Sequence, residues 1–594
     1  MSICKIWFEP FKKSVKCNAG AILRDIAIIA DLKIASGCGG EGVCGQCLVH
    51  ILDGHVSLPT DLESDHLDVK ALKDGKRLAC QTHIMGDVIV YIPPASLLVA
   101  HRIDLTKFDL QTPVNPIVKN LSITLDPQNI DSFPIHRQLV DSLFIEHNLR
   151  IKSIDIFALR GLSDIIKKNK LKARIIVRGQ EIIDVCAPCK PSLGLAIDIG
   201  TSKIESCMMD MNTGKELSVH GIVNPQVIYG DDVMSRITYA IKGGSKRLNR
   251  VLVDGLNEII KQLGEDPERI IDISVAANTA IHHLLLCLPV HQLGMSPYQS
   301  IINMKLTIKA RDMGLNVAPG AYVYMFPPVS GFIGGDHVAL ILATGIYCTD
   351  KTVMAVDIGT NTEIVLAHDG KLTSCSVASG PAFEGTHIKH GMRAASGAIE
   401  GIDIRDNVIE VKTINDDPAI GICGSGVLDV LCKLKCTGLV DNRGRLKGSV
   451  GQSDNNNNQE IILVSKTESG NGQEITISEK DIREIQLAKA AIRAGVEVLL
   501  RNRNICSNDL DEFIIAGAFG THINVENAIT IGMFPPIPLD RFKHVGNAAL
   551  SGAIMALISR SYQEMGDKIV NSIHYLGLMT HPDFPKIFAH AMYI

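Results

Sequence analysis

The 594-residue sequence has no run of about 18 or more apolar residues, so we expect no transmembrane helix. It has no strong excess of one charge either, since 59 Lys and Arg stand against 64 Asp and Glu for a net charge of −5. This balance argues against nucleic acid as the main partner. The 16 cysteines are too few for a disulfide scaffold, and the first residues form no apolar signal core. We therefore expect a cytoplasmic chain with reduced thiols.

The composition is otherwise that of a globular protein, with 46% hydrophobic and 21% charged residues, which excludes a disordered or coiled-coil chain. At roughly 150 residues per domain the length suggests about four domains. The patterning predicts a β-rich domain over 1–93, a linker over 94–120, a small α/β domain over 121–192 and an α/β region over 193–594.

Individual elements can be placed in the first two of these domains. The first has strand-like stretches at Ile3–Phe8 and Gly86–Pro93 and a short helical stretch at 21–30. In the small α/β domain we predict strands at Leu121–Leu125 and Lys172–Val177 and helices at 136–149 and 161–169.

Four cysteines near the N-terminus predict an iron–sulfur cluster. Three lie in a glycine-rich loop with the spacing C-x5-C-x2-C, and a fourth follows 33 residues later: Cys38, Cys44, Cys47 and Cys80. A cluster needs four thiolates in one small volume, and glycines let backbone N–H groups point at its sulfides. The alternative is a structural zinc site, although such sites usually show two symmetric short pairs. The layout is close to that of plant-type ferredoxins, so we predict a 2Fe–2S cluster with a potential of around −400 mV.

The other twelve cysteines give a weaker signal. Cys186 and Cys189 form a C-x2-C pair, but no second pair stands at zinc spacing, so a redox or metal role is not favoured. Six single cysteines in apolar or small-residue surroundings are predicted to be buried thiols: Cys207, Cys287, Cys348, Cys375, Cys423 and Cys506.

A second pattern occurs twice, at 194–203 and 353–362, where an apolar strand runs into Asp-x-Gly-Thr. One copy alone would be weak, because Asp-Gly turns end many strands, but two copies 159 residues apart indicate a duplication. The glycine offers no Cβ to obstruct a phosphate, and the residues after it present N–H and hydroxyl groups to phosphate oxygens. Asp198 and Asp357 are suited to holding Mg²⁺ through water. The predicted phosphate-binding residues are Gly200, Thr201, Ser202, Gly359, Thr360 and Asn361.

Two small-residue segments complete a candidate nucleotide site. A strand at Phe513–Ala516 ends in Gly517, Ala518, Phe519 and Gly520, where adenosine could lie against backbone. Another turn leads into a helix through Gly424, Ser425 and Gly426, which suits lobe crossing or base contact. No Walker phosphate loop occurs near it.

A catalytic carboxylate is also needed near the γ-phosphate. The candidates are Asp232, Asp336 and Glu384, each of which is equally consistent with a helix N-cap or a first-turn acid.

The motifs at Asp198, Asp357 and 517–520 resemble those of the ASKHA superfamily, which includes acetate and sugar kinases, the heat-shock chaperone ATPase and actin. The resemblance covers about 193–594, with lobes at about 193–352 and 353–594. The fold class that it implies is multidomain α/β: an N-terminal β-grasp ferredoxin-like domain, a small α/β middle domain and a C-terminal duplicated, two-lobed, actin-like ATPase domain.

The combination resembles the reductive activators of corrinoid-dependent methyl-transfer systems over essentially the whole chain. Four segments look like that family: Ser330–Asp336, Ala378–Gly385, Ala516–Gly520 and Val545–Gly552. The resemblance implies ATP-dependent, one-electron reduction of Co(II) to Co(I), with a 2Fe–2S cluster, ATP and Mg²⁺ as cofactors. It also implies a corrinoid protein of a methyltransferase or O-demethylase system as partner, a low-potential electron donor and a homodimer, with no nucleic acid and no membrane.

Two other classes of function stay open. One is an ASKHA activator that passes electrons to a different low-potential acceptor, like the activators of 2-hydroxyacyl-CoA dehydratases. The other is an ATP-driven binding or chaperone-like module whose cluster only senses redox state.

Overall fold

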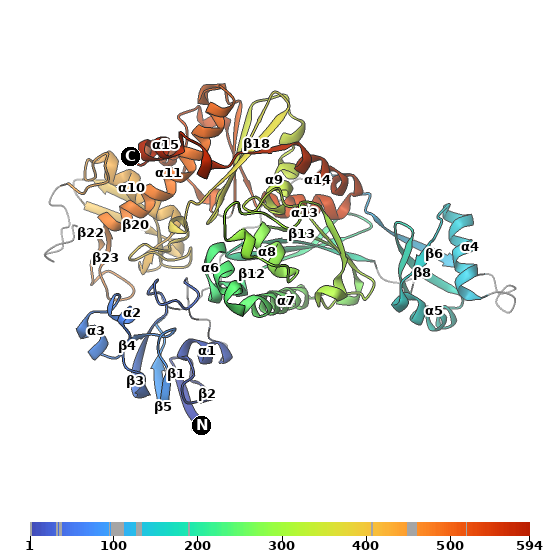
Figure 1. Cartoon of the computed structure of the whole chain (residues 1–594), viewed down its shortest axis with the longest axis horizontal. Coiled ribbons are helices and arrows are strands. Elements are labelled where there is room, and N and C mark those ends of the chain that lie inside the picture. Colours follow the sequence, from blue (N-terminus) through green and yellow to red (C-terminus); the bar gives the residue numbers. More distant parts are fainter. Residues whose placement is uncertain are drawn as a thin grey trace.

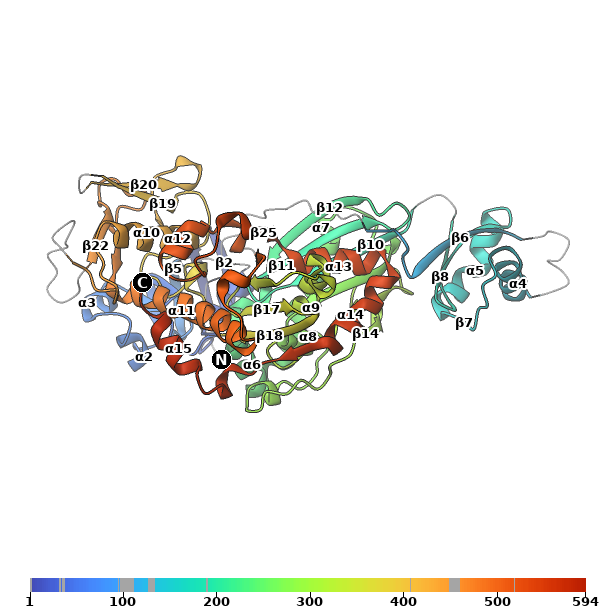
Figure 2. The ribbon, with the colours of Figure 1, turned by 90° about the horizontal axis from the view of Figure 1, so that it is seen from above.

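The computed structural model describes residues 3–30, 32, 34, 38–93, 96, 112–125, 134–187, 191–405, 408–447, 460–517 and 519–594. Figure 1 shows a blue N-terminal sheet beneath two large lobes and a cyan sheet at one end of the long axis. In the view from above, Figure 2 shows the cyan sheet at the same end of the molecule, so it projects beyond the lobes in both views. None of the helices within the described ranges is long and apolar enough to cross a membrane.

The N-terminal sheet has the strand order β2-β1-β5-β3-β4, and β1 pairs parallel with β5. Its strands are β1 (Ile3–Glu9), β2 (Lys13–Asn18), β3 (Leu48–Val56), β4 (Lys76–Leu78) and β5 (Ile84–Tyr91). The helices are α1 (Leu23–Ile29), α2 (Asp61–Ser64) and α3 (Val69–Lys73). Side chains alternate along β1, so that Cys4, Ile6 and Phe8 are buried against Leu23 of α1. The two strands and the helix predicted for this domain are confirmed as β1, β5 and α1.

A second, four-stranded sheet has the order β6-β8-β9-β7. It contains β6 (Val118–Thr124), β7 (Ser153–Ile154), β8 (Lys172–Arg178) and β9 (Glu181–Cys186), with helices α4 (Ile135–His147) and α5 (Ile156–Lys168). The helix predicted at 161–169 begins five residues earlier, because Asp155 caps it by accepting a hydrogen bond from the Phe157 N–H. Most of the predicted linker 94–120 lies outside the described residues, and its last three residues belong to β6.

This second sheet is held to the first large lobe by ion pairs. Arg178 on β8 lies 3.6 Å from Asp272 of β13 (Ile270–Ala277), and the Asp272 side chain is fully buried. Asp155 forms an ion pair with Lys309 at 2.9 Å. The Tyr322 hydroxyl donates to Glu181 at 2.6 Å. Asp155 is buried as well, but it also pairs with Arg311 and so keeps a cation if one contact is lost. The Arg178–Asp272 pair is therefore the contact whose loss should cost most.

We expect Arg178→Met to destabilise the chain by about 3 kcal/mol at pH 8, because it leaves a buried carboxylate without its cation. Burial already raises the pKa of Asp272 to about 6. Below that pH the folded protein keeps Asp272 neutral, so the loss should be smaller at pH 5 than at pH 8. Denaturant unfolding at both pH values measures this. Adding Asp272→Asn should remove the pH dependence, and an equal loss at pH 5 and pH 8 would contradict the assignment.

Five of the six strands in each large sheet share one topology, which is the structural counterpart of the predicted duplication, and the sixth strand joins opposite edges of the two sheets. Their orders are β12-β11-β10-β13-β15-β14 and β25-β24-β16-β17-β18-β26. In each sheet, the strand that carries the repeated motif is β10 or β16. On one side of it two strands follow in antiparallel pairing, and on the other side two strands follow in parallel pairing. The predicted α/β fold class is confirmed.

The strands of the first of these sheets are β10 (Leu193–Ile199), β11 (Lys203–Asp210), β12 (Glu216–Val223), β13, β14 (Leu306–Lys309) and β15 (Tyr322–Met325). Those of the second are β16 (Val353–Asp357), β17 (Thr362–His368), β18 (Lys371–Val377), β24 (Glu512–Ala516), β25 (Phe542–Gly546) and β26 (Ile573–Tyr575). Smaller sheets contain β19 (Ala398–Arg405), β20 (Val408–Thr413) and β21 (Gly421–Ile422), and β22 (Glu460–Val464) with β23 (Ile475–Ser478).

Helices fill the space between and around the lobes. They are α6 (Val233–Tyr239), α7 (Ser245–Gln262), α8 (Thr279–Leu285), α9 (Gly335–Thr344), α10 (Gly424–Cys436), α11 (Glu479–Asn502), α12 (Val525–Thr530), α13 (Ala548–Ile558), α14 (Arg560–Ser572) and α15 (Phe584–Ala591). Every residue of α13 is buried, and α13 packs with α9 in a core that joins Ala196 of the first sheet to Ala355 of the second. The two lobes therefore share one hydrophobic core.

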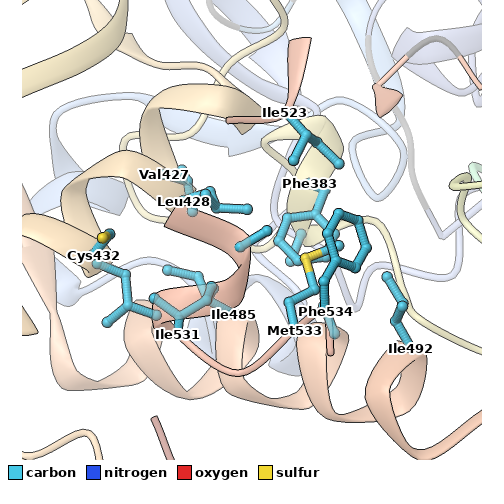
Figure 3. Close-up of a cluster of buried hydrophobic side chains, with 14 of the residues drawn as sticks. Phe383, Val427, Leu428, Cys432, Ile485, Ile492, Ile523, Ile531, Met533 and Phe534 are labelled. Atoms are coloured by element: carbon cyan, nitrogen blue, oxygen red, sulfur yellow. The ribbon is translucent and has the colours of Figure 1, made fainter. Parts of the chain in front are cut away.

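A second core lies behind the nucleotide-type segments. Figure 3 shows Phe383 beside Val427 and Leu428 of α10, with Ile485 and Ile492 of α11 below them. This packing fixes the start of α10 and the turn that carries Glu384.

The burial prediction for the single cysteines is only partly right. Cys207, Cys375 and Cys423 are buried, whereas Cys287, Cys348 and Cys506 are exposed. The three exposed ones lie at or beyond the ends of helices and strands, where apolar neighbours in sequence do not determine burial. Cys186 is half-buried at the end of β9, and Cys189 lies outside the described residues.

Candidate functional site

The four N-terminal cysteines come together as two pairs at the end of the first sheet. The Cys44 thiol hydrogen-bonds Cys38, and the Cys47 thiol hydrogen-bonds Cys80. Cys47 and Cys80 are buried, while Cys38 and Cys44 are half-buried. The loop glycines at 39, 40, 42 and 45 all have positive φ, which is the conformation that the sequence argument required.

The electrostatics of these thiols favour one thiolate in each pair. The hydrogen bond from Cys44 lowers the pKa of Cys38 to about 4, and that from Cys47 lowers the pKa of Cys80 to about 7. The same contacts raise the pKa of Cys44 and Cys47. The Gln81 amide donates to the Cys80 sulfur at 3.5 Å and to the Gly40 carbonyl at 2.9 Å. Cys38 and Cys80 are therefore held ready for deprotonation, which metal–thiolate bonds require.

This paired arrangement fits a cluster with two irons. In a 2Fe–2S cluster each iron takes two thiolates, and the two pairs of thiols supply two apiece.

The two Asp-x-Gly-Thr loops face each other across the lobes, and Glu384 bridges them. Its carboxylate accepts one hydrogen bond from the Ser202 hydroxyl and one from the Thr360 hydroxyl, each at 2.7 Å. Glu384 lies between Ala382 and Gly385 in a short turn after β18. Of the three candidate catalytic carboxylates, it is the one in contact with both loops.

Neighbouring elements hold the loop backbones. The Asn224 side chain donates to the Gly200 carbonyl at 2.8 Å, and Arg236 donates to the Thr201 carbonyl at 2.5 Å. In the second loop the Ser379 hydroxyl lies 3.0 Å from the Gly359 carbonyl. With their carbonyls occupied in this way, the loops can present N–H groups to an anion.

Three half-buried carboxylates lie close together at the loops. Burial raises the pKa of Asp336 to about 6 and that of Asp357 to about 7, and it raises the pKa of Asp198 as well. Repulsion between these carboxylates raises the pKa values of Asp198 and Asp357 further. Asp336 is in the first turn of α9, where a helix N-terminus favours negative charge.

Strand pairing adds two glutamates that the sequence analysis missed. Glu205 on β11 lies opposite Asp198, and Glu363 on β17 lies opposite Asp357, so the duplication repeats an Asp–Glu pair. The Asn547 side chain, at the start of α13, donates to Asp198 at 2.8 Å and also to Glu205. A repeated glutamate six or seven residues after each aspartate was the available sequence signal for the pair.

The predicted adenosine segment lies beside the second loop. Ala516 pairs with Asp357 across β24 and β16, so Gly517 follows directly beside that carboxylate. Gly517 has φ +92, and a Cβ there would meet the Ile358 carbonyl at 2.6 Å. Phe519 stacks on Phe383 with ring centroids 4.9 Å apart, next to Gly424. Ala518 lies outside the described residues.

Asp232, the remaining candidate, has a structural role. It caps α6 by accepting a hydrogen bond from the Ser235 N–H at 2.8 Å. The adjacent Asp231, which was not among the sequence candidates, is half-buried, and partial burial raises its pKa to about 6 with Arg393 and Glu384 nearby.

Known families match three parts of the chain. Residues 8–85 match the 2Fe–2S iron–sulfur cluster binding domain, 193–349 match the RACo middle region, and 351–594 match the C-terminal domain of RACo, the ASKHA domain. A solved structure described as a reductive activator for corrinoid, iron-sulfur protein is 32% identical, with a TM-score of 0.74. The match covers 100% of this chain and 98% of that one.

The chain belongs to the reductive activators of corrinoid proteins.

Two curated relatives agree with this assignment. The activator is 29% identical to the corrinoid activation enzyme RamQ of Eubacterium limosum, over 98% of each chain. It is 26% identical to the [Co(II) methylated amine-specific corrinoid protein] reductase of Methanosarcina barkeri, over 62% of this chain and 70% of that one. The 2Fe–2S domain and the ASKHA domain predicted from the sequence are thus confirmed.

Proposed function

We propose that this protein reduces the Co(II) form of a corrinoid protein to Co(I) by one electron in an ATP-dependent reaction. One observation carries the proposal: a single chain contains two different sites. One has two pairs of cysteines, and the other has two facing phosphate-type loops that Glu384 bridges. The full-length likeness to a reductive activator supports it.

The proposed cluster ligands follow the observed pairs. Cys38 and Cys44 would hold one iron, and Cys47 and Cys80 the other. A bound 2Fe–2S cluster supplies a one-electron centre of low potential. Gln81 and the loop backbone would keep the thiolates oriented and add hydrogen bonds to sulfur.

The nucleotide site is proposed to hold ATP with Mg²⁺. Asp198, Asp336 and Asp357 are half-buried and close enough to repel one another, and a triphosphate could not enter beside ionised carboxylates without a cation. Mg²⁺ prefers oxygen ligands and retains water, so carboxylates can hold it through water. The loop residues already named would contact phosphate, and Gly424, Ser425, Gly426 and 517–520 would contact the nucleoside.

ATP has a thermodynamic role in this proposal. A ferredoxin-type donor lies above the very low Co(II)/Co(I) potential, and for one electron each 59 mV is about a factor of ten in the equilibrium. Closure of an ASKHA-type cleft can supply the conformational change that makes the transfer favourable. We further propose that the electron comes from a low-potential donor in the cytoplasm. A homodimer and the domain boundaries 1–93, 94–120, 121–192 and 193–594 stay predictions.

The test is an anaerobic mixture of the protein, a Co(II) corrinoid protein, a low-potential reductant and MgATP, followed by visible spectroscopy. We expect the Co(I) spectrum only when ATP is present, and ATP hydrolysis stimulated by the Co(II) protein. Absence of both effects, with the cluster spectrum intact, would refute the proposal. Reduction of a different acceptor without cobalt reduction would favour another electron activator.

A further inference from the structure

The cysteine loop rests directly on the first ATPase lobe. The Cα of Gly39 approaches the Tyr229 backbone so closely that a Cβ at this position would lie 2.3 Å from the Tyr229 carbonyl oxygen. Two residues on, Glu41 forms an ion pair with Lys242 at 2.8 Å. Ile28, at the end of α1, packs against the small core of Tyr229, Val233 and Ile237. The contact therefore combines backbone, charge and apolar packing.

The lobe residues in this contact belong to one segment, 224–242, whose other side holds the first phosphate loop. At its start, Asn224 donates from its side chain to the Gly200 carbonyl at 2.8 Å, and its N–H donates to the Ser202 carbonyl at 3.0 Å. Further along, Arg236 donates to the Thr201 carbonyl. The same segment thus contacts both the loop proposed to bind phosphate and the loop proposed to bind iron.

Arg236 makes the connection stiff. Its side chain is fully buried, and its Nε donates to the Gly230 carbonyl at 2.8 Å. Gly230 follows Tyr229 directly, so one guanidinium group fixes both Thr201 and the backbone beside Gly39. Tyr229 packs on Tyr239 with ring centroids 4.9 Å apart and ring planes tilted by 34°, which joins two turns of the segment.

We propose that residues 224–242 transmit nucleotide binding at the first phosphate loop to the cysteine loop, and that nucleotide releases the cysteine loop from the lobe. A ligand shifts such an equilibrium only if it binds the two states differently. The proposal therefore requires that nucleotide bind more tightly once the cysteine loop is released, and the contact point is the loop whose carbonyls Asn224 and Arg236 hold in the docked state. Arg236 is a positioning residue in this scheme, and release frees the face of the cysteine loop that Tyr229 covers. The proposal rests on nucleotide binding in the proposed function.

Hydrogen exchange of the full-length, cluster-loaded protein tests the coupling, with and without the non-hydrolysable analogue AMPPNP and Mg²⁺. We expect the analogue to slow exchange at 198–203 and 357–362 and to speed exchange severalfold at 38–45, which has no role in nucleotide binding. Lys242→Glu should speed exchange at 38–45 without nucleotide, because it places like charges opposite each other. Lys242→Glu with Glu41→Lys should restore the slow exchange. Lys261→Glu, an exposed charge reversal at the far end of α7, is the matched control and should change nothing at 38–45.

The outcomes separate this inference from the function on which it rests. Slower exchange at both phosphate loops with no change at 38–45 would overturn the coupling and leave the proposed ATP site standing. No change at any of the loops would refute nucleotide binding and, with it, both proposals. Failure of the double charge reversal to restore slow exchange would exclude the Glu41–Lys242 contact as part of the connection.

Discussion

Replacing Cys38 or Cys80 with serine is expected to abolish ATP-dependent cobalt reduction while leaving basal ATP hydrolysis in place. The two residues belong to different thiol pairs, so in the proposed cluster each change would remove one ligand from a different iron. Serine is a poor ligand for iron in such a cluster, because its hydroxyl stays protonated at neutral pH, whereas Cys38 and Cys80 have lowered pKa values of about 4 and about 7. Absorption and EPR spectra of anaerobically purified protein report the loss directly.

Cys17→Ser provides the matched control for this experiment. Cys17 is in the same domain but on β2, where it faces Cys4 rather than the cysteine loop, so its loss should leave the cluster spectrum unchanged. Iron and zinc analysis of the unmodified protein adds a second criterion. One zinc and no iron per chain, or an unchanged spectrum in Cys38→Ser, would overturn the pairing and the cluster assignment together.

Short-range patterns in the sequence were sufficient to predict the cysteine loop and the two phosphate-type loops. Each of these depends on residues within about ten positions, and glycines such as Gly40 and Gly45 signal the unusual backbone directly. The shared sheet topology followed from the repeat around Asp198 and Asp357. Local composition and periodicity were therefore sufficient to predict the fold class.

The rest of the site depends on contacts between distant parts of the chain. Asn547 reaches Asp198 across 349 residues, and Ser202 reaches Glu384 across 182, so no local pattern announces either contact. Sequence reasoning placed Asp232 and Glu384 as equal candidates, because an acid before a helix can be a cap or a catalyst. Only the tertiary structure separates them. Asp232 caps a helix, whereas Glu384 accepts a hydrogen bond from one hydroxyl of each lobe.

Glu384→Gln should lower the kcat of ATP hydrolysis by about 100-fold or more, with a small change in KM for ATP. The carboxylate accepts hydrogen bonds from Ser202 and Thr360 at once, and it is the acid that connects the two loops. A glutamine keeps the size but has one acceptor oxygen, so one hydroxyl loses its partner. It also cannot take a proton from a nucleophile. Steady-state hydrolysis with the Co(II) corrinoid protein present measures the effect, and cobalt reduction should fall with it if hydrolysis is required.

Asp232→Asn distinguishes a catalytic from a structural acid in the same neighbourhood. Asparagine is a good N-cap, so this change should leave kcat within about twofold and stability nearly unchanged.

If Glu384→Gln and Asp232→Asn lose activity equally, the bridging carboxylate has no special role. If Glu384→Gln keeps full hydrolysis, Asp231 becomes the acid to replace next, because it is half-buried near Glu384 and has a pKa raised to about 6. If Glu384→Gln retains ATP binding and cobalt reduction but not hydrolysis, binding alone drives the electron transfer, and hydrolysis serves to reset the protein.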